Sequence, residues 1–63
     1  MRYVIIQVEE VVKETDLAVL LRIDGEDHWI PKSQISPDSE YVEAECDLEI
    51  EVTKWIASEK GLE

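Results

Sequence analysis

Cysteine, histidine, glycine and proline are all scarce in this chain of 63 residues. It has one cysteine (Cys46), one histidine (His28), two glycines and two prolines. A single cysteine excludes a disulfide within the chain, and one cysteine with one histidine cannot supply the four ligands of a structural zinc site. Two glycines leave no glycine-rich loop to hold a phosphate group. We therefore expect no cofactor and no metal, and a protein that is not an enzyme.

Positive charge is scarce as well. Six lysines and arginines stand against 16 aspartates and glutamates, which gives a formal net charge of −10 at pH 7. Such a charge repels phosphates and anionic lipids, so it argues against direct binding to nucleic acid or membranes. The hydrophobic fraction of 44% is too high for a disordered acidic tail. These features favour a folded protein that has either a highly soluble surface or a protein partner with a basic surface.

Long hydrophobic runs are also missing. The start, MRYVIIQVEE, has only four consecutive apolar residues before Gln7, which is too few for a secretory signal, and no stretch approaches the length of a membrane span. With one unpaired cysteine, this predicts a cytoplasmic protein. A single domain of this size buries only about 60% of its unfolded surface, so tight packing or a homodimer is expected to supply the missing burial.

Alternation of apolar and polar residues dominates the sequence and predicts β-strands. In the first strand, over 2–15, Val4, Ile6 and Val8 share one face, and the pair Glu9-Glu10 breaks the alternation. This break indicates a bulge or bend, which would let one long strand serve two sides of a small barrel. A second strand spans 16–24, and its expected inward residues are Leu17, Val19, Leu21 and Ile23.

Turn signals define the middle of the chain. Asp24-Gly25 predicts a two-residue hairpin turn, and a short third strand over 28–31 ends at Pro31 because proline cannot donate to a ladder. Residues 32–40 are typical of a loop with one turn of 3₁₀ helix.

The second half is expected to hold one or two strands over 41–52, with Cys46 on the apolar face as a small core residue. Thr53 is a plausible N-cap for a C-terminal helix over about 54–60, with Gly61 at its C-terminal cap. The sequence thus predicts one mainly β domain over 1–63: an SH3-like or OB-like half-barrel of four to five antiparallel strands with a short C-terminal helix.

Two motifs carry a resemblance: WIPKSQI at 29–35 and WIASEKGL at 55–62. Over about residues 17–62 the chain resembles small, mostly uncharacterised proteins of bacteriophages and prophages, in which a strand ends in this turn and the chain closes with this helix. The resemblance implies a small phage-type β domain in the host cytoplasm and carries no assigned reaction. A looser resemblance is to the SH3 fold, but the acidic-aromatic ligand loop of that family is absent, so polyproline binding is not supported.

Trp29 and His28 are neighbours on the third strand, so their side chains must point to opposite faces. In one interpretation Trp29 is an aromatic anchor for a partner; in the other it lies in the core or at its half-buried rim. Nothing near His28 in the sequence supports a role as a catalytic base.

Lys32, Ser33 and Gln34 also allow two interpretations. They could form a contact loop for a partner, or they could hold the local turn by hydrogen bonds to nearby backbone. The sequence does not decide between them.

An acidic row is the other candidate site. In a regular strand, one face would carry five carboxylates: Glu43, Glu45, Asp47, Glu49 and Glu51. They could occupy a basic groove of another protein, or they could be a solvated face that protects an edge strand from aggregation. Side chains spaced along one strand diverge, which argues against a calcium site.

Three functions fit these features. The leading hypothesis is an inhibitor or modulator of a host nucleic-acid-processing or defence protein, bound through the acidic row with Trp29 and the 32–34 loop adding specificity. The second is a self-associating accessory protein of a phage assembly. The third is a protein that sequesters a small ligand such as a nucleotide between protomers.

Overall fold

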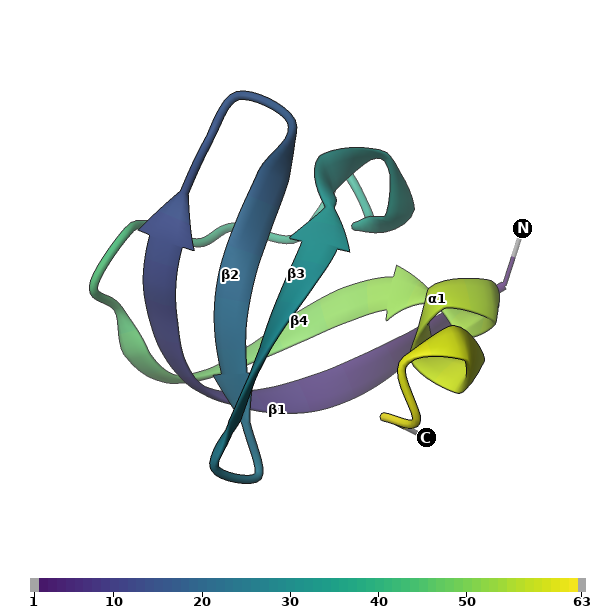
Figure 1. Ribbon diagram of the computed structural model, residues 1–63. Helices are drawn as coiled ribbons and strands as arrows, with labels where there is room; N and C mark the ends of the chain where they lie inside the picture. Colours follow the sequence, from purple (N-terminus) through teal and green to yellow (C-terminus); the bar gives the residue numbers. More distant parts are fainter. Residues whose placement is uncertain (1, 63) are drawn as a thin grey trace.

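The computed structural model describes residues 2–62 as one four-stranded antiparallel sheet followed by a short helix (Figure 1). The sheet order is β3-β2-β1-β4. The elements are β1 (Tyr3–Glu14), β2 (Ala18–Ile23), β3 (Glu26–Pro31), the 3₁₀ helix η1 (Lys32–Gln34), β4 (Cys46–Thr53) and α1 (Lys54–Glu59). The predicted class, a mainly β fold with a C-terminal helix, is confirmed.

Strand β1 is long and bent, and it serves two neighbours. Its first part pairs with β4, and its last part, from Glu10 onward, pairs with β2. The buried residues change alternation between Val8 and Val11, which places a bend at the predicted position. The shift of register with β2 lies slightly beyond it, between Val11 and Lys13. The bend turns the sheet around a single core.

The hairpin between β2 and β3 is built as predicted. Asp24 and Gly25 both have positive φ, 52° and 77°, which is the backbone of a type I′ turn and matches the twist of the flanking strands. The Gly25 N–H donates to the Glu9 carboxylate across 2.6 Å. This turn fixes the register of the two strands, so it decides which side chains of β3 face outward.

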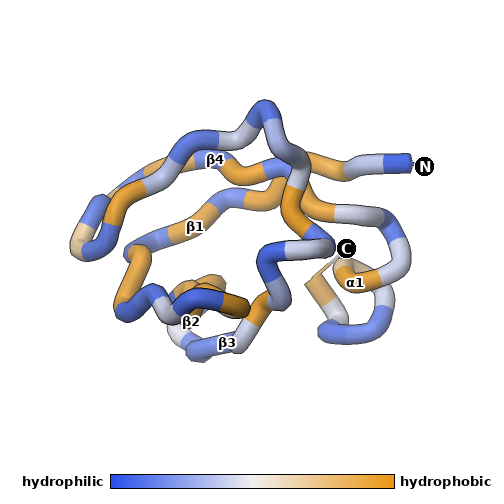
Figure 2. Tube along the Cα trace, turned by 90° about the horizontal axis from the view of Figure 1, so that it is seen from above, coloured by the Kyte–Doolittle hydropathy of each residue, from blue (hydrophilic) through white to orange (hydrophobic). Residues whose placement is uncertain are grey.

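The core consists of apolar residues from all four strands, the loop after η1, and the inner side of α1. Hydrophobic and hydrophilic residues alternate along β1 and β4, as Figure 2 shows. The buried apolar residues are Ile6, Val8, Val11, Val19, Leu21, Ile23, Ile30, Ile35, Leu48, Ile50, Val52, Ile56 and Ala57.

Both predicted caps of the helix are present. The Thr53 hydroxyl accepts a hydrogen bond from the Ile56 N–H at 3.2 Å. At the other end Gly61 has a φ of 70°, and the Leu62 N–H donates to the Ala57 carbonyl at 2.8 Å. This is the Schellman arrangement, which satisfies carbonyl groups that the last turn of a helix leaves free.

Two predictions about burial are wrong. Leu17 was expected to face inward, but it precedes β2 and is 82% exposed. Cys46 was expected in the core, on one apolar face with Val42 and Ala44, and all three residues are exposed. The cause is local: Ala44 and Asp47 have positive φ, 72° and 54°, so the two-residue period of β4 does not extend through Cys46 to residues 41–45.

Candidate functional site

The hairpin register places Trp29 on the outer face of the sheet. Trp29 pairs with Leu20, whereas His28 pairs with Leu21, which is fully buried. Cross-strand partners share a face, so His28 turns toward the core side and Trp29 turns away from it. Trp29 is 43% exposed, which makes it a half-buried rim residue with surface left for contact.

The polar turn after Pro31 is largely engaged within the molecule. Lys32 Nζ lies 2.7 Å from the Glu14 carboxylate, and this hydrogen bond raises the pKa of Lys32 above its ordinary value. The Gln34 Oε1 accepts a hydrogen bond from the Thr53 hydroxyl at 2.7 Å. Ser33 is exposed. These bonds favour the structural interpretation for Lys32 and Gln34, although the partners are side chains of β1 and β4 and not the local backbone.

Replacing Thr53 by valine is expected to lower the free energy of unfolding by about 2 kcal/mol. The buried hydroxyl accepts from the Ile56 N–H and donates to Gln34, so its loss removes the cap of α1 and leaves the Gln34 oxygen without its donor. Urea titration followed by circular dichroism measures the change. Thr53→Ser keeps the hydroxyl and should lose less than half as much; an equal loss from both would rule out the hydrogen bonds as the cause.

The prediction that five acidic residues form a continuous row on one face of a strand is wrong. Strand β4 begins only at Cys46, so Glu43 and Glu45 lie outside it, and Asp47 within it has a positive φ of 54°. The Glu43 carboxylate accepts from the Glu14 N–H at 3.0 Å, and that of Glu45 accepts from the Val42 N–H at 3.1 Å, so both fasten the loop before β4. Glu49 and Glu51 remain on the outer face.

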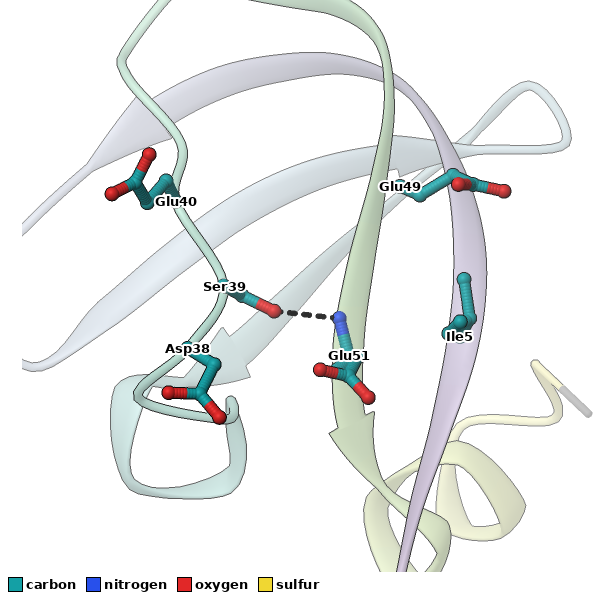
Figure 3. A pocket seen from close by; sticks show the side chains of 6 residues that line it. All are labelled: Ile5, Asp38, Ser39, Glu40, Glu49 and Glu51. Atoms are coloured by element: carbon teal, nitrogen blue, oxygen red, sulfur yellow. Dashed lines mark hydrogen bonds between the residues drawn. The ribbon is translucent and has the colours of Figure 1, made fainter.

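Glu49 and Glu51 instead line a hollow that the sequence did not predict. We call it the acidic hollow; its volume is about 360 Å³, and it is lined by Ile5, Asp38, Ser39, Glu40, Glu49 and Glu51. Figure 3 shows the four carboxylates around it, with Ile5 contributed by β1. The Ser39 hydroxyl accepts from the Glu51 N–H at 2.8 Å and so ties the 38–40 segment to the edge of β4.

No lysine or arginine is among the residues that line the acidic hollow. Arg22 and Lys32 form salt bridges with Glu10, Asp27 and Glu14, none of which lines the hollow. Of the four carboxylates, Glu49 accepts a hydrogen bond from the Gln7 side-chain amide at 2.7 Å. Ile5, which is 62% exposed, adds an apolar surface. Carboxylates beside an apolar surface suit a lysine or arginine side chain, whose stem is apolar and whose head is charged.

Across residues 2–62, no group of three or more histidine, cysteine, aspartate or glutamate side chains is arranged to hold a metal ion. No helix in this range is long and apolar enough to cross a membrane.

The fold and surface define a small β-sheet domain with a C-terminal helix and an acidic hollow on its outer face. No protein-family model, curated protein or solved structure matches the chain. Function is therefore inferred from the surface itself.

Proposed function

We propose that this protein is a small acidic binding protein of the bacteriophage type, which inhibits or modulates a host protein through direct contacts. The partner would carry a basic surface, such as the groove with which a nucleic-acid-processing or defence enzyme binds its substrate. The observation that supports this most strongly is the acidic hollow, which Asp38, Glu40, Glu49 and Glu51 line together with the exposed Ile5.

The chemistry of the hollow favours a protein partner over a free anion or nucleic acid. No lysine or arginine is among the residues that line the hollow, so its four carboxylates attract cations, and the net charge of −10 adds a long-range field of the same sign. Such a field accelerates the approach of a basic partner and repels nucleic acid. A groove that binds phosphates presents the lysine and arginine side chains that the hollow suits.

A capture experiment from a bacterial lysate tests the proposal. The wild-type protein and the variant Glu49→Gln with Glu51→Gln serve as baits, and retained proteins are identified by mass spectrometry. The expected result is a basic protein that binds the wild type and is lost with the variant. Glutamine keeps the size of the side chain, so any loss reports the charge.

The matched control removes the same number of charges elsewhere. Asp16→Asn with Glu59→Gln changes two exposed carboxylates, one before β2 and one at the end of α1. This variant should retain the partner. If both double variants lose it equally, net charge and not the acidic hollow governs binding, and if neither loses it the proposal is wrong.

A self-associating accessory protein is the second candidate, because Leu17, Trp29 and Trp55 leave apolar surface exposed. Light scattering at micromolar concentration distinguishes a self-associating protein from a monomeric binding protein. A mass of 7.3 kDa, that of one chain, would count against self-association.

A further inference from the structure

The outer edge of β3 has no strand beside it, because β3 ends the sheet order β3-β2-β1-β4. In a hairpin with a two-residue turn, alternate residues of β3 from Glu26 onward exchange hydrogen bonds with β2. The backbone groups of the intervening residues Asp27, Trp29 and Pro31 therefore point to the open edge. Among residues 2–62, the turn, loop and side-chain hydrogen bonds use none of the Asp27 and Trp29 backbone groups. The edge thus offers a donor and an acceptor at each of these two residues.

An apolar surface lies directly beside this edge. Trp29 shares its cross-strand row with the half-buried Leu20. Leu17, which is largely exposed, is held close to the end of β3 because its carbonyl accepts from the Lys32 N–H at 2.9 Å. Pro31 is exposed at the end of the strand. A strand added at the edge would cover part of this surface, which supplies the side-chain contacts that open backbone groups alone lack.

The charge near the edge specifies what kind of strand would fit. Asp27 lies two residues from Trp29, on the same outer face, and Asp24 and Glu26 are exposed at the hairpin end. Arg22 is the cation paired with Asp27, at 2.9 Å. An added strand would therefore meet apolar surface at Trp29 and acidic surface near the turn.

A second copy of the chain fits this edge poorly. Two copies of the chain, each with a net charge of −10, repel each other as they approach. Pro31 also lacks the N–H that a regular pairing would use. A basic segment from another protein is attracted by this charge, and it can pair with Asp27 and Trp29 without extending to Pro31.

We propose that the open edge of β3 binds an extended segment of a basic partner as an added strand. The segment carries an apolar side chain against Trp29 and a lysine or arginine two residues away, near Asp27. This inference rests on the proposed function and names the part of the partner that is bound. The acidic hollow would contact a separate basic region of the same partner.

Selection from a displayed library of random peptides tests the proposal with the full chain. Enriched peptides should share an apolar residue and a lysine or arginine two positions apart, without proline between them. Their binding should weaken about 30-fold in Trp29→Ser, the loss typical of a central aromatic anchor. Trp55→Ser is the matched control, because Trp55 is an exposed tryptophan on α1, and it should leave binding unchanged.

A change in the peptide distinguishes strand addition from a side-chain contact alone and leaves the protein intact. Two methylated forms of an enriched peptide are compared, one with methyl groups on the backbone nitrogens of its odd positions and one with them on its even positions. One form should lose binding and the other should keep it, because only every second N–H of an added strand faces β3. The amide signals of Asp27 and Trp29 should shift in NMR spectra. If both methylated forms of the peptide still bind, the proposal is overturned.

Three other results would also overturn it. The first is a library without enrichment, and the second is a dimer that Trp29→Ser dissociates, since the edge would then serve a second copy. The third is capture of a lysate partner that depends on Glu49 and Glu51 but not on Trp29. This third result would contradict strand addition at β3 but would not contradict the proposed function.

Discussion

Replacing Ile6 by alanine is expected to lower the free energy of unfolding by about 2–5 kcal/mol. Ile6 lies on the inner face of β1, is 5% exposed and pairs with the fully buried Ile50 on β4. The substitution leaves a cavity in a core that is small to begin with. A chain of 63 residues has a total stability of about 3–9 kcal/mol, so the substitution removes a large share of it.

The adjacent residue supplies the control. Ile5 has the same side chain on the opposite face and is 62% exposed, so Ile5→Ala should change stability by no more than about 0.5 kcal/mol. Urea titration of both variants by circular dichroism gives the comparison. Equal losses would mean that the assignment of the two faces of β1 is wrong.

The double charge reversal Glu49→Lys with Glu51→Lys is expected to weaken partner binding by at least about 100-fold. Each lysine repels the basic side chain that the glutamate is proposed to attract, so the effect should exceed that of neutral glutamine. The fold should survive, because Glu49 is exposed and neither side chain belongs to the buried core. Titration calorimetry with the captured partner measures the affinity.

Asp16→Lys with Glu59→Lys alters the net charge by the same amount at a distance from the hollow. This control should weaken binding by less than about tenfold, the effect of a change in long-range attraction. An equal loss from both reversals would show that the position of the carboxylates does not matter.

Most of the fold could be predicted from short sequence patterns, because its strands, hairpin turn and helix caps are determined by residues that are close together in the chain. Alternation revealed the strands, Asp24-Gly25 revealed the hairpin, and Thr53 with Gly61 revealed the caps of the helix. Each depends on residues adjacent in the chain. The side of the sheet that Trp29 occupies depends on the hairpin register, which the turn geometry fixes and the alternation of residues does not specify.

The acidic row was mispredicted because the backbone departs from the regular strand at two residues. Ala44 has a φ of 72°, although an alanine side chain disfavours the left-handed region. Nothing in the alternation of the sequence signals this, so the period was carried through to Glu43 and Glu45. Their carboxylates serve instead as hydrogen-bond acceptors that fix the loop.

The acidic hollow could not be predicted from the sequence for a different reason. It forms where the 38–40 segment lies along β4, held by the hydrogen bond from the Glu51 N–H to the Ser39 hydroxyl and by the bond from the Ser36 N–H to the Glu51 carbonyl. These contacts join residues far apart in the chain. From the sequence alone, Asp38 and Glu40 are only members of the predicted loop over 32–40.

The salt dependence of partner binding tests the central claim most directly. Affinity of the wild-type protein for the captured partner is measured as NaCl rises from about 0.05 M to about 0.5 M, where the range of electrostatic interactions shortens severalfold. Binding through the acidic hollow predicts a fall of at least about tenfold, and a smaller fall for Glu49→Gln with Glu51→Gln. An affinity that stays constant across this range would contradict the account.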